Sequence, residues 1–121
     1  MPTEAEEFPI IVMDDDQWMY VYASLDQLMQ DAEPSFLDDV TAAFDGRARV
    51  LQLSLDESGE EIRIEVKSSD PQLERLQSCV EEFFAAWTHD APPERLNEPR
   101  QYTQSVVSTY ALRRDRRRKN S

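Results

Sequence analysis

Glycine, cysteine and histidine are nearly absent from this sequence. Its 121 residues include two glycines, one cysteine and one histidine. The Rossmann and P-loop phosphate-binding loops each need several glycines within a few residues, so both are excluded. A single cysteine, Cys79, rules out an internal disulfide and is typical of a reducing compartment. One histidine and one cysteine are too few for a zinc site.

Long apolar runs are also missing. The longest apolar stretches span about six residues, against the ~20 that a membrane-spanning helix needs. No basic segment followed by an apolar one opens the sequence. We therefore expect a soluble, cytoplasmic protein with no membrane partner. A chain of this length buries roughly two-thirds of the surface that its unfolded form exposes, which is enough for one core.

Acidic residues outnumber basic ones, and the two signs are unevenly placed. The chain has 25 acidic and 13 basic side chains, a net charge of −12. Residues 113–119 hold six basic residues and one acidic residue, which leaves 24 acidic and seven basic residues in 1–112, a net charge of −17. Such a surface repels nucleic acid and anionic lipid and attracts basic proteins. The alternative is that the charge serves solubility alone.

The basic segment at the end has three interpretations. It could bind nucleic acid, but the acidic body would oppose that approach and no aromatic residues interleave with the arginines to stack on bases. It could contact the acidic body of its own or a neighbouring copy. The simplest interpretation is a disordered, solubilising end. We therefore expect one α+β domain at residues 1–112 and a basic, disordered tail at 113–121.

Apolar periodicity predicts strands in the first half of the chain. Residues 8–13 and 18–22 are apolar and aromatic runs on either side of an acidic turn, which indicates a hairpin. Residues 40–44 and 48–55 flank a second turn, and residues 61–67 alternate between apolar and charged side chains as a half-buried strand does. The sequence thus predicts about five strands.

The second turn contains Asp45-Gly46, a dipeptide typical of type I′ hairpin turns. A two-residue turn there pairs Phe44 with Arg47 and puts Arg49 on the same face as the core leucines of the next strand. Either these arginines lie beyond the edge of the core, or a bulge shifts the register.

Helices are expected at three places. Ser24 is a candidate N-cap for a short helix over 24–32. Asp70-Pro71 is typical of a helix start, and the helix then runs to about Trp87 with one apolar stripe made of Leu73, Leu76, Val80, Phe83, Phe84 and Trp87. Residues 102–110 have helical spacing but many β-forming side chains, and we favour a helix.

Together these elements predict an α+β fold. An antiparallel sheet of about five strands packs on one long amphipathic helix, and a short helix completes the domain.

Catalytic machinery is not indicated. His89 lies next to Asp90 in a proline-flanked loop, and no serine or cysteine stands in a recognisable nucleophile motif. Cys79 falls among apolar helix positions, where burial makes a thiol unreactive. With 25 acids, a pair of carboxylates at catalytic spacing carries no information. We expect a protein that is not an enzyme and that uses no cofactor.

The run Asp14-Asp15-Asp16 could bind a divalent cation through its oxygens. It lacks the alternating acids, the glycine and the closing glutamate of an EF-hand loop, and the residues that follow belong to a strand. A solvated acidic turn is the simpler interpretation, and we expect no metal.

The arrangement of residues 18–87 suggests a family. It comprises the aromatic strand WMYVYAS, the helix entry SLDQL, DAEP, the hairpin FDGRARVLQLSLD and the helix DPQLERLQSCVEEFFAAW. In order and acidity it resembles small bacterial immunity proteins, which are encoded beside secreted polymorphic or contact-dependent toxins. The resemblance implies a stoichiometric inhibitor that binds a cognate toxin domain and occludes its active site. It assigns no functional residue and does not account for the basic tail.

Charge suggests which residues would contact such a toxin. An acidic domain can enter an electropositive substrate groove in place of phosphate. We expect the contacts at strand ends and in loops, at Asp14, Asp15, Asp16, Asp38 and Asp39. Trp18 is a candidate aromatic anchor, although a core position in the second strand is the simpler interpretation of this residue.

Two other functions fit the same charge. A non-enzymatic adaptor or chaperone for a secreted effector would keep its client soluble without blocking an active site. A DNA-mimicking inhibitor of a nucleic-acid enzyme would differ from an immunity protein only in its target.

Overall fold

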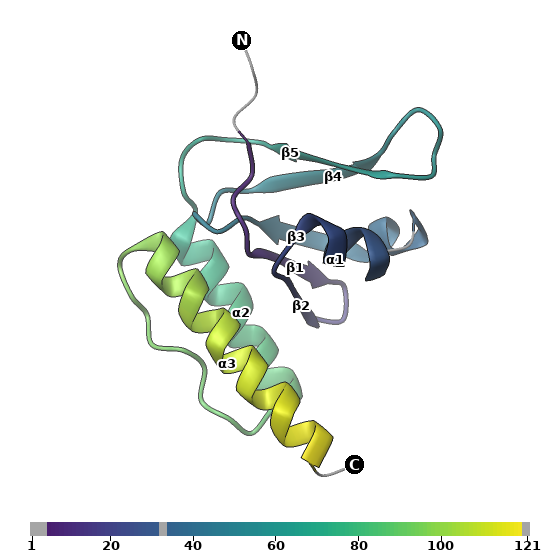
Figure 1. Cartoon of the computed structure of the whole chain (residues 1–121). Coiled ribbons are helices and arrows are strands. Elements are labelled where there is room, and N and C mark those ends of the chain that lie inside the picture. The colour runs from purple at the N-terminus through teal and green to yellow at the C-terminus, as the bar shows by residue number, and fades with distance from the viewer. Residues whose placement is uncertain (1–4, 32–33, 120–121) are drawn as a thin grey trace.

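A computed structural model describes residues 5–31 and 34–119 (Figure 1). In chain order the elements are β1 (Ile10–Asp14), β2 (Met19–Tyr22), α1 (Leu25–Asp31), the 3-10 helix η1 (Pro34–Asp39), β3 (Val40–Phe44), β4 (Leu51–Leu55), β5 (Ile62–Val66), α2 (Leu73–Trp87) and α3 (Pro99–Lys119). The predicted α+β class is confirmed. Within the described residues, no helix is both long and apolar enough to cross a membrane.

The five strands form two antiparallel sheets, so the predicted single sheet is wrong. β2, β1 and β3 make one sheet in that order, and β4 and β5 make the other. An isolated bridge between Phe44 and Val50 links them. Beyond this bridge β4 leaves β3 and completes its hydrogen bonding with β5, where Leu51 pairs with Val66. Because β4 finds its hydrogen-bonding partner in β5, its backbone is satisfied without continuing the first sheet.

The turn at Asp45-Gly46 differs from the predicted two-residue turn. The Ala48 N–H donates to the Asp45 carbonyl oxygen at 2.9 Å, and Ala48, with a φ of 61°, takes the left-handed conformation. Phe44 therefore pairs with Val50 and not with Arg47. The register is shifted, which was the second of the two expected alternatives.

The shift carries Arg49 into the interior, where Asp45 neutralises it. The two side chains are 2% and 0% exposed, and a guanidinium nitrogen lies 2.6 Å from a carboxylate oxygen. Gly46 is required for a separate reason. A Cβ at this position would lie 2.7 Å from the Phe8 carbonyl oxygen, so only glycine lets the N-terminal segment cross the turn so closely.

β1 is the central strand, and both of its faces are covered. Ile11 and Met13 face a core shared with α2 and α3, whereas Ile10 and Val12 face a second core that includes Leu28 of α1. This explains why residues 8–13 read as a continuous apolar run instead of an alternating one. In Figure 1, α2 and α3 lie on one side of the three-stranded sheet, and α1 with the β4–β5 hairpin lies on the other.

The predicted starts of α1 and α2 have different outcomes. The Ser24 cap is confirmed, because its hydroxyl oxygen accepts a hydrogen bond from the Gln27 N–H at 3.2 Å. The predicted end of α1 at residue 32 lies outside the described residues. The predicted start of α2 at Asp70-Pro71 is wrong: the helix begins at Leu73, because the Gln72 N–H donates to the Ala48 carbonyl oxygen at 2.8 Å and holds the chain in a non-helical conformation before it.

α3 is a second long helix, so the expectation of one long helix is also wrong. The helix predicted for 102–110 is confirmed, and Tyr102 and Val106 are buried beside α2. Burial of these side chains overrides the β-forming tendency of the threonines and valines around them. The helix continues through Lys119. The division into a domain at 1–112 and a tail at 113–121 stays a prediction, and residues 120–121 lie outside the described chain.

Candidate functional site

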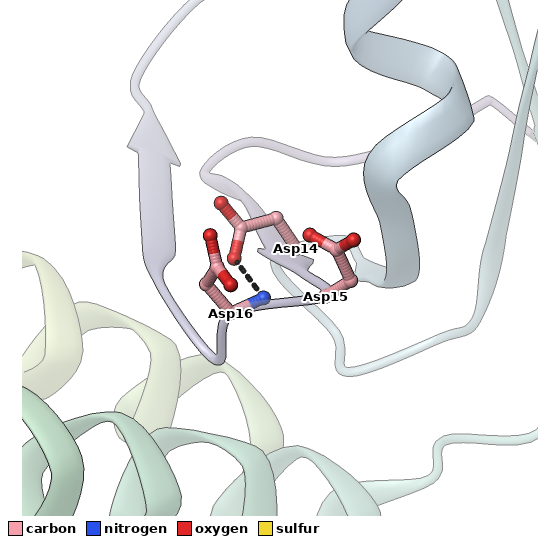
Figure 2. Close-up of side chains that lie close together, drawn as sticks. All are labelled: Asp14, Asp15 and Asp16. Carbon is pink, nitrogen blue, oxygen red and sulfur yellow. Dashed lines mark hydrogen bonds between the residues drawn. The ribbon is translucent and has the colours of Figure 1, made fainter.

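The acidic turn between β1 and β2 is held together by Asp14. One of its carboxylate oxygens accepts hydrogen bonds from the N–H groups of Asp16 and Trp18, each at 2.9 Å, and the other accepts one from the Tyr20 hydroxyl at 3.2 Å. Figure 2 shows the three carboxylates around this turn. Asp15 and Asp16 are exposed, so they carry their charge directly into solvent.

The same turn is the place where a cation could bind. Carboxylate oxygens of Asp14, Asp15 and Asp16 lie within 4.8 Å of one another. Both oxygens of Asp14, however, already accept hydrogen bonds from groups of its own turn. The local geometry therefore fits the interpretation of a solvated acidic turn, in which Asp14 sets the shape and its neighbours present charge.

Strand direction brings the second predicted acidic pair beside this turn. Asp14, at the end of β1, pairs with Val40, at the start of β3, because the strands are antiparallel. Asp38 and Asp39 immediately precede Val40 and are exposed. Five of the six residues predicted for the site thus come to one end of the three-stranded sheet.

A third acidic segment, which is not among the residues predicted for the site, lies at the same end. β4 runs antiparallel to β3 from the Phe44–Val50 bridge and contacts η1, so the β4–β5 turn lies toward the start of β3. Figure 1 shows the β1–β2 turn, η1 and the β4–β5 turn all at the right of the molecule. We call the three segments 14–16, 38–39 and 56–61 the acidic end. They hold nine carboxylates, three, two and four respectively, and no lysine or arginine.

Asp56 holds the third segment in shape. Its carboxylate accepts a hydrogen bond from the Ser58 hydroxyl at 2.6 Å. This bond, above all, lowers the pKa of Asp56 below its ordinary value, with further help from backbone N–H groups of the turn. The carboxylate is therefore ionised throughout the neutral range and adds to the charge of the acidic end.

Two tryptophans lie next to the acidic end. Trp18 is partly buried and packs edge to face on Phe83 and Trp87, with ring centroids 5.3 and 5.1 Å apart, which favours its interpretation as a core residue. Trp87 is 46% exposed, and its indole N–H donates to the Asp16 carbonyl oxygen at 2.9 Å. The sequence places Trp87 on the apolar stripe of its helix, but Trp87 is the last residue of α2 and remains partly exposed.

The residues considered for catalysis do not belong to the segments of the acidic end. His89 is exposed in the loop after α2, and Cys79 is partly buried on α2 itself. Burial raises the pKa of the Cys79 thiol, so the thiol is protonated and weakly nucleophilic at neutral pH. The expectation that the chain is not an enzyme stays a prediction.

Comparison with known proteins gives no family. No family model matches this chain, and no match was found among the curated proteins or the solved structures. What is established is an α+β fold with one three-stranded and one two-stranded antiparallel sheet. The resemblance to immunity proteins stays a prediction from the sequence.

Proposed function

We propose that this chain is an immunity protein that binds a basic toxin domain at its acidic end and occludes the toxin's active site. One observation carries the proposal: nine carboxylates from three separate segments lie at one end of the molecule, and these segments contain no basic residue. Repulsion between like charges opposes such an arrangement in the free protein. A cationic partner turns that repulsion into attraction.

Charge of this kind acts mainly on the rate of encounter. A concentrated acidic surface attracts a basic groove over about a Debye length and raises the association rate by roughly 10- to 1000-fold at low salt. It also discriminates against acidic and neutral partners. Trp87, half-exposed beside Asp16, supplies the large aromatic side chain that interfaces commonly use as an anchor.

The mechanism of inhibition follows from the same surface. A toxin that cleaves or modifies nucleic acid has an electropositive groove for phosphate, and a row of carboxylates fits that groove electrostatically. The inhibitor then needs no reaction centre, since occupancy of the groove is enough. An adaptor or chaperone for a secreted effector is a second candidate, because exposed apolar side chains beside the acidic end, Leu25 and Met29, suit client binding.

The test uses the product of the neighbouring gene. Its C-terminal domain is expressed in cells with and without this protein, growth is followed, and the purified pair is studied by stopped-flow at several salt concentrations. We expect growth to be restored and the association rate to fall steeply with salt. A partner that stays toxic but becomes more soluble would favour the chaperone instead. A protein that binds no product of its neighbourhood would contradict the proposal.

A matched pair of variants locates the interface. Asp15→Asn with Asp16→Asn and Asp39→Asn removes three exposed charges from the acidic end, and Asp70→Asn with Glu74→Gln and Glu94→Gln removes three exposed charges from residues outside it. We expect the first variant to associate about tenfold more slowly at low salt and the second to change little. Equal slowing by both variants would remove the acidic end from the interface.

A further inference from the structure

An open apolar groove lies between α1 and the β4–β5 hairpin. Leu25 and Met29 of α1 form one wall, and Ile62 with the adjoining Glu60 and Glu61 forms the other. The groove has a volume of about 380 Å³. Leu25 is 43% exposed and Met29 is 39% exposed, so these two large apolar side chains face solvent.

The position of α1 explains why these side chains are not buried. Leu28 is fully buried and fixes the helix on the core beneath it. Leu25 and Met29 are four residues apart and therefore lie on one face of the helix, turned toward the hairpin. Leu55, which pairs with Ile62, is 39% exposed and extends the apolar surface along the hairpin. The exposed apolar surface therefore comprises several neighbouring side chains, those of Leu25, Met29 and Leu55.

The rim of the groove has one sign of charge. Glu60 and Glu61 are exposed and belong to the 56–61 turn, which holds four acids and no basic residue. Asp26, also exposed, lies on α1 between the two apolar positions. An occupant must therefore contact the apolar side chains that line the groove and neutralise the carboxylates beside them. An acidic or purely polar segment would leave one of these two requirements unmet.

We propose that the groove binds a basic segment of the partner protein, which inserts one long apolar side chain against Leu25 and Met29 and places lysines or arginines beside Glu60 and Glu61. The inference rests on the proposed function, because the groove adjoins the acidic end, and it names the chemistry of the contact: an apolar residue flanked by cations. Charge raises the association rate, and burial of the apolar side chain lowers the dissociation rate. Methionine suits this role, since its flexible thioether adapts to the inserted side chain.

Peptides that differ at one feature test this chemistry on the full chain. The first has a central leucine flanked by lysines, the second has serine in place of the leucine, and the third has glutamates in place of the lysines. Methyl NMR of the protein follows Leu25, Met29 and Ile62 during titration. We expect the first peptide to shift these methyl signals and to bind about tenfold more tightly than the second, with no binding of the third. Equal affinity for the leucine and serine peptides would overturn the inference.

Variants of the protein separate the groove from general attraction to an acidic molecule. Glu60→Gln with Glu61→Gln removes two charges at the rim, and Glu74→Gln with Glu94→Gln removes two exposed charges elsewhere. The rim pair should weaken binding of the first peptide about tenfold while the control pair leaves it within about twofold. Met29→Ser should weaken the leucine peptide but not the serine peptide. Equal weakening by both charge pairs would overturn the inference.

The outcomes also separate this inference from the proposed function. If the toxin domain is neutralised while the groove methyl signals stay unchanged in the complex, the inference fails and the function stands. If the leucine peptide binds in the groove but no toxin is neutralised, the function fails and the groove remains a docking surface. If the groove signals change on dilution of the protein alone, another copy of this chain occupies the groove, which overturns the assignment to a partner protein.

Discussion

Replacing Asp45 by alanine tests how the fold keeps a charged residue in its interior. One Asp45 oxygen accepts hydrogen bonds from the backbone N–H groups of Arg47 and Arg49, each at 3.0 Å. The other accepts two from the Arg49 guanidinium, at 2.9 and 2.6 Å, and one from the Glu7 N–H at 3.1 Å. The carboxylate therefore joins the turn, the buried arginine and the N-terminal segment.

The expected loss follows from what the substitution leaves behind. Arg49 is 2% exposed, so without Asp45 its charge stays buried and has lost its carboxylate partner. The Ala5 carbonyl oxygen, which accepts a hydrogen bond from the Arg49 guanidinium at 2.9 Å, is among the acceptors that remain. Removing one partner of a buried pair destabilises a protein by about 3–5 kcal/mol. Since domains of this kind have a free energy of unfolding of about 5–15 kcal/mol, Asp45→Ala should remove a large part of it.

A double-mutant cycle measures the pairwise part. Arg49→Met removes the stranded charge and keeps an apolar side chain of similar length, so the double variant should be more stable than the sum of the two single losses predicts, by about 1–3 kcal/mol. Urea unfolding followed by circular dichroism gives each free energy. A loss below about 1 kcal/mol for Asp45→Ala, or strict additivity in the cycle, would refute the reasoning.

Three further predictions concern the same core and its N-terminal segment. Gly46→Ala should destabilise the fold by about 1–3 kcal/mol in urea unfolding, because its Cβ would meet the Phe8 carbonyl oxygen at 2.7 Å; an unchanged midpoint would contradict the close approach. Phe84→Asp should abolish cooperative unfolding at 25 °C, because Phe84 is 2% exposed, and a variant with the full melting temperature would mean that the helix face is misassigned. The hydrogen bond from Arg100 lowers the pKa of Glu7, so the pair stabilises the fold above the unfolded-state pKa and is lost as the pH falls through the lowered pKa. Glu7→Gln should therefore lower the melting temperature at pH 7, with the difference vanishing in acid, and a constant difference across pH would contradict it.

The helices show how far local signals reach. The apolar stripe of α2 requires only spacing along the chain, and its interior positions from Leu76 to Phe84 are buried as the spacing predicts. The start of α2 is different, because Asp70-Pro71 has the local chemistry of a helix start, and a hydrogen bond from Gln72 to distant Ala48 overrules it. Local propensity thus predicts the existence of a helix better than its first turn.

The sheets show the same limit at longer range. Each strand is recognisable from its own residues, but whether β4 continues the first sheet depends on the turn at 45–49. That turn depends on Arg49, whose charge is acceptable in the interior only beside Asp45. In the sequence, the two arginines conflict with a simple hairpin, and a bulge is one of two ways to resolve that conflict. The local pattern does not reveal that Asp45, a residue of the turn itself, neutralises Arg49 in the interior.

For the acidic end too, some features depend on local sequence and others on tertiary structure. Sequence alone determined the strong negative charge, the strand and helix segments and the acidic turns, because each depends on neighbours within a few residues. Tertiary structure decided that three acidic segments lie at one end, that Trp87 is half-exposed beside Asp16 and that a groove with apolar side chains adjoins the 56–61 turn. Those features arise from strand direction and helix placement, which are set by contacts between residues far apart in the chain.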